Sequence, residues 1–242
     1  MSFANCVDGI KVIIVVDNRR VSRNVISAWG LSIYLECESA KILFDTDSSW
    51  EILRHNSEVL KVPLRDLDFV FISHWHGDHS GGLGGLTAYL ASVGRGAKVL
   101  APSRPLFRRG DFIDAGRPVK LCDGIITSGV LGRFLKEHSL IINVKGCGPV
   151  VFVGCSHPGV ASILERAAEV TESSSIWGVI GGFHIDAAEA YDVAKVLEHF
   201  DVKLVAPCHC TSNAAINVLS KLLAERFVSA YAGRRIVIGG NC

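Results

Sequence analysis

The chain has 242 residues, of which 49% are hydrophobic and 20% are charged, a composition that excludes an intrinsically disordered protein. Its formal net charge of +1 excludes a global electrostatic attraction to nucleic acid or to an anionic membrane. No apolar run reaches the roughly 18 residues of a spanning helix, and the N-terminal run ends at Asp17 without a signal-peptide cleavage site.

Short apolar, β-branched runs bounded by turn residues predict ten strands, at 11–16, 31–36, 41–45, 69–73, 98–100, 139–144, 149–154, 176–182, 202–207 and 234–240. Helical periodicity predicts helices at 48–60, 83–93, 158–171, 186–200 and 211–227. Pro158 suits a first helical turn, Asp186 is the expected cap of the fourth helix, and Thr211 or Ser212 that of the fifth. The segment 102–120, rich in proline and arginine, predicts a long surface loop.

The order of these elements indicates the fold class. Strands open the chain in hairpin-like succession, with one turn at 38–41, and strands alternate with helices in the second half. This order favours an α/β protein with two stacked sheets and helices outside them. Because neither a linker nor a repeat interrupts the chain, we expect one domain over residues 1–242.

The sequence FISHWHGDHSGG places four potential metal ligands directly after a predicted strand: His74, His76, Asp78 and His79. Histidines two positions apart on a strand point the same way, so the first two can hold one metal ion. After the chain turns at the next glycine, the aspartate and the third histidine can face a second ion. A lone histidine at a strand end is more often structural, but four ligand types within six residues favour a metal site.

Three further histidines, His157, His184 and His209, follow other predicted strands in the sequences GCSH, GGFH and PCH. If these strand ends converge, they complete the site. The glycines at 77, 81, 82, 84 and 85 suit a tight turn and a close backbone approach to it.

The HxHxDH pattern after an apolar strand resembles the signature of the metallo-β-lactamase superfamily, and KILFDT resembles its upstream strand, ending in an Asp45 that supports the metal loop. The set SHWHGDHSGGL, GCSHPG, GGFH and PCHCT resembles one branch of that superfamily. This is the 7,8-dihydropterin-6-ylmethyl-4-(β-D-ribofuranosyl)aminobenzene 5'-phosphate synthase branch, which serves tetrahydromethanopterin biosynthesis. The resemblance runs from about Val12 to the C-terminus.

The resemblance implies a four-layer αββα sandwich with two divalent ions at one edge between the sheets. It assigns His74 and His76 to the first ion, and Asp78, His79 and His209 to the second. Histidine-rich ligation favours zinc, with manganese or iron as alternatives.

The middle ligands stay open, because the sequence departs from the pattern of many relatives there. His157 is assigned as a ligand, and His184 as either a ligand or a substrate contact. Cys155 is a bridging ligand, a group that supports the ligands, or a small buried hydrophobe. His138 is expected to be structural.

The eight cysteines form no CxxC pair, which predicts a reduced, cytoplasmic protein. Cys208 and Cys210 flank His209, and in an extended segment they would point away from it and pack. The lack of glutamine and the single methionine favour a thermophilic source, and in that case some cysteines could pair even inside a cell.

The resemblance implies an enzyme in which an aromatic acceptor displaces pyrophosphate from a dihydropterin, with Asp78 handling a proton and His184 contacting substrate. The substrate phosphate would meet arginines of the 102–120 segment, which are otherwise a solvated face: Arg104, Arg108, Arg109 and Arg117. The alternative is a hydrolase of a small-molecule phosphodiester, lactone or other ester that uses a metal-bound hydroxide. Either way we expect a small-molecule substrate, with no nucleic acid or membrane as partner.

Overall fold

The structure is a computed structural model that describes residues 5–103 and 112–240. Its strands form two sheets. The seven-stranded sheet has the order β13-β1-β2-β3-β4-β5-β6, with β1 Gly9–Val16, β2 Ser32–Glu36, β3 Lys41–Phe44, β4 Phe69–Phe71, β5 Lys98–Ala101, β6 Phe112–Asp114 and β13 Arg235–Gly239. The six-stranded sheet has the order β12-β11-β10-β9-β8-β7, with β7 Lys120–Cys122, β8 Ile125–Thr127, β9 Leu140–Val144, β10 Gly148–Val153, β11 Gly178–Gly182 and β12 Leu204–Cys208.

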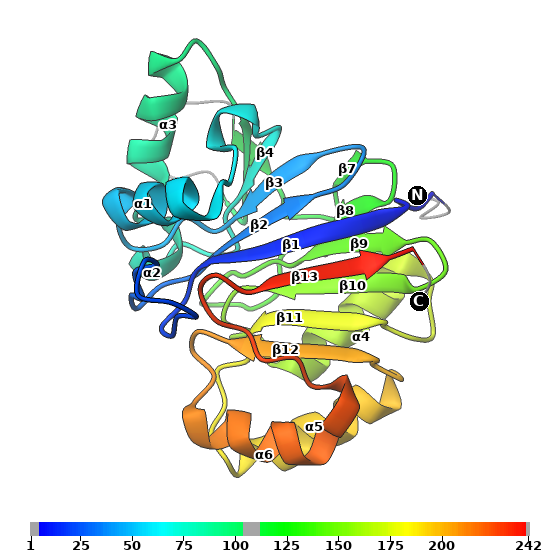
Figure 1. Ribbon diagram of the computed structural model, residues 1–242. Coiled ribbons are helices and arrows are strands. Elements are labelled where there is room, and N and C mark those ends of the chain that lie inside the picture. Colours follow the sequence, from blue (N-terminus) through cyan, green and yellow to red (C-terminus); the bar gives the residue numbers. More distant parts are fainter. Residues whose placement is uncertain (1–4, 104–111, 241–242) are drawn as a thin grey trace.

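Helices cover the outer face of each sheet, as Figure 1 shows. The helices are α1 Trp50–Leu60, α2 Gly77–Ser80, α3 Leu83–Ser92, α4 Val160–Thr171, α5 Glu189–His199 and α6 Asn213–Leu223, with 3-10 turns at Leu64–Asp66 and Ala224–Arg226. The first and third pack on the seven-stranded sheet, and the last three pack on the six-stranded sheet. The predicted αββα sandwich is therefore confirmed. Within the described ranges, no helix has the length and apolar character needed to cross a membrane.

The central core lies between the two sheets and follows from strand alternation. In β3, Ile42 and Phe44 face this core, whereas Leu43 packs under the outer helices. The Phe44 ring stacks on Phe71 with centroids 5.0 Å apart and meets Phe152 of the other sheet at 6.5 Å. These aromatic side chains join the sheets independently of any bound ion.

The sheet topology brings several strand ends to one edge. The strands β3, β4, β5 and β6 run parallel, as do β10, β11 and β12. Two successive antiparallel pairings, β1 with β2 and β2 with β3, give β1 the same direction as β3. Parallel strands end on the same side of a sheet, so the segments that follow them become neighbours.

Some local predictions were wrong. Segment 102–120 is not one long loop, because Phe112–Asp114 pairs with β5 and Lys120 begins β7; residues 104–111 lie outside the described residues. The strand Ile125–Thr127 and the short helix Gly77–Ser80 were also missed, since three or four residues are too few to show a period.

Two predicted helix starts are shifted, and a third is confirmed. Helix α4 begins after an N-cap at Gly159, so Pro158 precedes it. Asp186 accepts the backbone N–H groups of Ala188 and Glu189 at 2.8 and 3.2 Å, and so caps the turn that leads into α5. Ser212 caps α6 as expected, accepting the backbone N–H of Ala215 at 3.1 Å.

Candidate metal centre

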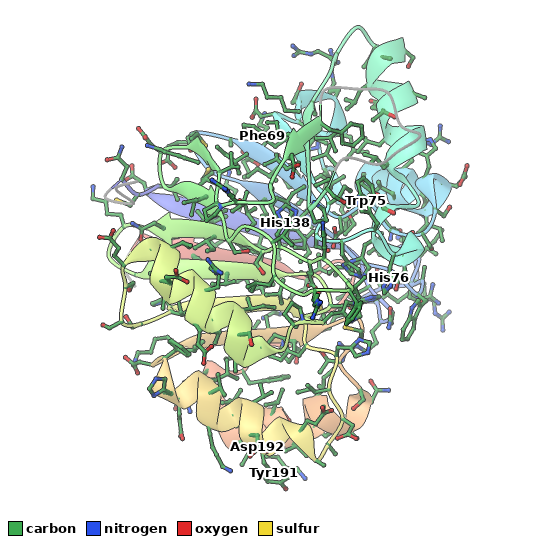
Figure 2. The ribbon with its side chains drawn as sticks, turned by 180° about the vertical axis from the view of Figure 1, so that it is seen from behind. Phe69, Trp75, His76, His138, Tyr191 and Asp192 are labelled. Atoms are coloured by element: carbon green, nitrogen blue, oxygen red, sulfur yellow. The ribbon has the colours of Figure 1, made fainter. Side chains whose placement is uncertain are left out.

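All the histidines of the strand-end motifs meet at the edge described above, with Asp78 and Cys155. His74 and His76 follow β4, Asp78 and His79 lie in α2, Cys155 and His157 follow β10, His184 follows β11, and His209 follows β12. Their nitrogen, oxygen and sulfur atoms form overlapping groups of three within 4.8 Å of one another. Figure 2 shows His76 at this side of the molecule.

One group consists of His74, His76 and His157. His74 Nε2 lies 3.1 Å from His76 Nδ1, and the His157 ring centroid is 4.9 and 5.1 Å from those of the other two. His157 Nε2 is buried and has no hydrogen-bond partner among residues 5–103 and 112–240. A buried nitrogen without a partner is costly, and a metal ion would satisfy it.

A second group consists of Asp78, His79 and His209. The Nε2 atoms of the two histidines lie 3.1 Å apart, and Asp78 Oδ2 lies 3.4 Å from His209 Nε2. The two histidine side chains are fully buried, whereas 21% of the Asp78 side chain is exposed. This group therefore opens to solvent on its carboxylate side.

Cys155 lies between the two groups. Its Sγ is 3.2 Å from His79 Nε2, and it also belongs to groups with His74 and with His157 and His184. A thiolate at this place would contact ions on both sides. The expectation that Cys210 points away from the site was wrong, because its sulfur forms a further group with the Cys155 sulfur and a ring nitrogen of His209.

Hydrogen bonds fix which ring nitrogens face the centre. His79 Nδ1–H donates to Asp45 Oδ2 at 2.6 Å, which leaves a lone pair on Nε2. The Asn18 amide donates through Nδ2 to the His209 carbonyl at 2.8 Å, so its Oδ1 accepts from His209 Nδ1–H at 3.2 Å. The Nε2 of His209 therefore also carries a lone pair.

Two lone pairs facing each other at 3.1 Å repel unless a cation lies between or beside them. His74 follows the same rule, since Ser73 Oγ donates to Asp45 Oδ2 at 2.7 Å and accepts from His74 Nδ1–H at 3.0 Å. The donor set therefore fits divalent metal ions.

The titration properties agree with ligation. Burial lowers the pKa of His79 to about 3 and that of His157 to about 4, and it holds the pKa of His74 far below its usual range. The pKa of Asp78 lies below its usual range, and the adjacent His209 side chain is the largest cause. Neutral imidazoles and an ionised carboxylate are the forms that bind metal.

The backbone is left-handed at several of these strand ends. Asp45, Ser156, His184 and His209 have φ values of 58°, 59°, 50° and 51°. Non-glycine residues adopt this region rarely and at a cost, and such residues cluster at functional sites. Because the backbone is left-handed at His209, the segment is not extended there, and Cys210 lies at the site instead of pointing away from it.

Some glycines of the metal loop explain its close packing. A Cβ on Gly81 or Gly82 would overlap backbone carbonyl oxygens of Ser48 or Thr46, so only glycine fits there. Gly77 and Gly84 have open space around their Cα atoms, and the predicted close approach does not occur at them.

Apart from Asp45, sequence reasoning missed the residues that hold the ligands. The buried Glu137 carboxylate accepts the backbone N–H groups of Cys155, Ser156 and His157 at 3.0, 2.8 and 2.9 Å. Burial raises its pKa to about 7. Asp17, noted in the sequence only as the end of an apolar run, accepts the N–H of His209 at 2.7 Å.

The remaining predicted residues lie in different surroundings. His184 is exposed, with its ring centroid 4.8 Å from that of His157. Arg117 is exposed between β6 and β7, without a hydrogen bond or ion pair to the described residues, and Arg104, Arg108 and Arg109 lie outside them. His138 is buried near the middle of the fold (Figure 2), with Nε2 2.8 Å from a backbone oxygen, which agrees with a structural role.

Comparison with known proteins adds independent information. The family model of the metallo-beta-lactamase superfamily matches residues 30–209. The chain is 26% identical over 267 residues to the 7,8-dihydropterin-6-methyl-4-(beta-D-ribofuranosyl)-aminobenzene-5'-phosphate synthase of Methanocaldococcus jannaschii, covering 87% of this chain and 90% of that protein.

Two solved structures share the fold over most of both chains. Tm1679, a metal-dependent hydrolase of the beta-lactamase superfamily, has a TM-score of 0.75 and 24% identity, covering 94% of this chain and 98% of that one. The metallo-beta-lactamase fold protein YhfI from Bacillus subtilis has a TM-score of 0.66 and 15% identity, covering 95% and 99%.

Proposed function

The chain belongs to the metallo-beta-lactamase superfamily, and we propose that it is a dinuclear metal-dependent enzyme that joins a dihydropterin to an aromatic acceptor with release of pyrophosphate. The observation that carries this proposal is the similarity to the synthase from Methanocaldococcus jannaschii over 87% of this chain and 90% of that protein. The substrate would be a phosphorylated small molecule.

The two groups of ligands support the dinuclear part of the proposal. His74, His76 and His157 would hold one ion, and Asp78, His79 and His209 the other, with Cys155 between them. Histidine with sulfur favours zinc over harder ions. When bound, two divalent ions supply Lewis-acid stabilisation of the charge that develops on the departing pyrophosphate.

The chain's own groups would manage the proton. In the proposed reaction the acceptor forms a bond to the pterin methylene carbon, the carbon–oxygen bond to pyrophosphate breaks, and the acceptor loses one proton. Asp78 and His184 both have side chains open to solvent, so both are placed to take that proton. Arg117 and its segment would bind the acceptor's phosphate.

The test is a turnover assay with the metal-loaded full chain, the dihydropterin pyrophosphate and the aromatic acceptor. We expect pyrophosphate release that requires the acceptor, with the coupled product detected by mass spectrometry. The variant His79→Ala should lose most of this activity, whereas His199→Ala, which changes an exposed histidine of α5 outside the centre, should retain it.

The alternative hydrolase is tested in parallel with a panel of phosphodiesters, lactones and other esters. Efficient ester turnover without acceptor-dependent pyrophosphate release would refute the synthase proposal.

A further inference from the structure

A cavity of about 430 Å³ lies between the starts of α4 and α5, beside the candidate metal centre. We call it the α4–α5 pocket. Phe183 and Val193 give it an apolar wall, and its lining also includes the histidines His157 and His184 and the carboxylates of Glu189 and Asp192. This volume lies within the range of about 300 to 1,000 Å³ that is typical of small-molecule sites.

The pocket and the metal centre share residues. His157 and His184 line the pocket, and their ring nitrogens also group with Cys155 within 4.8 Å. A molecule in the pocket would therefore present one edge to the ligand cluster, while the rest of it lay against the apolar wall. This geometry suits the part of a substrate that adjoins the reacting atom.

The charged side chains that line the pocket determine which class of ligand it can bind. Among the described residues, those with charged side chains that line it are the carboxylates Glu189 and Asp192. Glu189 and Asp192 lie three positions apart on α5, so both can face the same side of the helix, and Figure 2 shows Asp192 on this helix. Lys195 offsets part of the Asp192 charge, but the lining as a whole still disfavours a phosphate and favours a neutral group that donates hydrogen bonds.

Each carboxylate also keeps an oxygen for a ligand. Glu189 Oε2 accepts the Asp186 N–H at 2.9 Å, and Asp192 Oδ1 accepts from Lys195 Nζ at 2.8 Å. The second oxygen of each has no hydrogen-bond partner in the described part of the chain. Two free acceptors above an apolar wall match a flat heterocycle whose edge carries N–H groups.

We propose that the α4–α5 pocket binds the 2-amino-4-oxo-pteridine ring of the substrate, with its ring N–H and amino group directed to Glu189 and Asp192. The identity of the ring rests on the proposed function. The phosphorylated acceptor binds elsewhere, because its charge opposes both carboxylates. In this arrangement the pterin methylene carbon faces His157 and His184.

The test is binding of a neutral fragment, 6-hydroxymethylpterin, to the metal-loaded full chain by isothermal titration calorimetry. Glu189→Gln combined with Asp192→Asn keeps shape but removes both charges, and Val193→Phe fills the pocket. Each change should weaken fragment binding about tenfold or more, since hydrogen bonds to charged groups and pocket volume both contribute on that scale. Glu198→Gln, on the same helix but outside the pocket lining, should bind like the original chain.

Two measurements separate this inference from the proposed function. Turnover of the dihydropterin pyrophosphate with the aromatic acceptor tests the proposed function, and binding of 6-hydroxymethylpterin tests the pocket. If the original chain does not bind the fragment, or if the charge variant and the filling variant bind as well as Glu198→Gln, the pocket inference is overturned even where turnover is seen. If binding depends on the pocket but no turnover occurs, the inference holds and the proposed reaction falls. Because the charge variant changes only exposed side chains, its result stands even if Val193→Phe fails to fold.

Discussion

Replacing Glu137 by glutamine should loosen the loop that carries Cys155 and His157. In the native protein one oxygen of Glu137 accepts the N–H groups of Cys155 and Ser156, and the other accepts that of His157 at 2.9 Å. A glutamine amide can keep the two bonds on its oxygen. Its NH2 group would then face the His157 N–H, donor against donor, and that bond is lost.

The size of the effect follows from these contacts. A hydrogen bond to a charged group contributes about 1.5 to 3 kcal/mol, and the two bonds that remain become neutral and weaker. Removing a buried charge offsets part of the loss, because burial is what raises the pKa of Glu137 to about 7. We therefore expect the free energy of unfolding to fall by about 2 kcal/mol at a pH near 8, where the carboxyl is ionised.

The assay has two readouts on the same variant. Urea denaturation of the metal-free protein measures the loss of stability, and competition with a chromophoric chelator measures metal affinity. Displacement of His157 should weaken metal affinity by about 10- to 100-fold. Glu165→Gln, an exposed position on α4, is the matched control. If Glu137→Gln matches that control in both readouts, the carboxylate does not hold the loop and the reasoning is refuted.

Three other changes test further parts of the structure. Asn18→Ala removes the acceptor that orients His209, and chelator competition should show metal affinity at that site lowered about tenfold or more. Gly181→Ala places a Cβ against a carbonyl oxygen of β10 at a residue with φ 137°, so denaturation should show the free energy of unfolding lowered by about 2 to 4 kcal/mol. Gly84→Ala, in open space on a helix, should raise the free energy of unfolding by about 1 kcal/mol. Burial lowers the pKa of His138 to about 4 in the folded protein, from a value near 6.5 in the unfolded chain. As the pH falls, the unfolded chain therefore binds a proton first, and the free energy of unfolding decreases between pH 6.5 and pH 4. In His138→Gln the stability measured over this pH range should decrease less; an unchanged slope would mean that His138 is not the titrating group.

The strands that carry long β-branched runs were predictable, because their residues alternate between two buried faces. The run KVIIVV became β1, and its neighbours in the central core followed the same rule. The strands β6, β7 and β8 were not predictable, since each has three residues that belong to no longer apolar run. Pairing with a neighbour, rather than local sequence, defines them.

The candidate site shows the same division between local and distant information. His74, His76 and His79 stand close together in sequence, so their pattern is visible without a structure. Their supports are distant. The hydrogen bond from His209 to Asp17 joins residues 192 positions apart, and a carboxylate that accepts backbone N–H groups, as Glu137 does, requires no particular side chain on the donor. Such a contact leaves no motif in the sequence.

These supports also explain how two sheets can form one metal centre. Asp17 lies at the end of β1 in one sheet and holds the backbone of His209 at the end of β12 in the other. A second bond between the two halves runs from the His138 N–H to the Ser73 carbonyl at 3.1 Å. Both bonds flank the ligands and do not depend on a bound ion. The edge is therefore preorganised, and the binding energy of the metal need not be spent on bringing the sheets together. Differences in substrate among proteins with this fold would then depend on what surrounds the centre, which in this chain is the carboxylate-lined α4–α5 pocket.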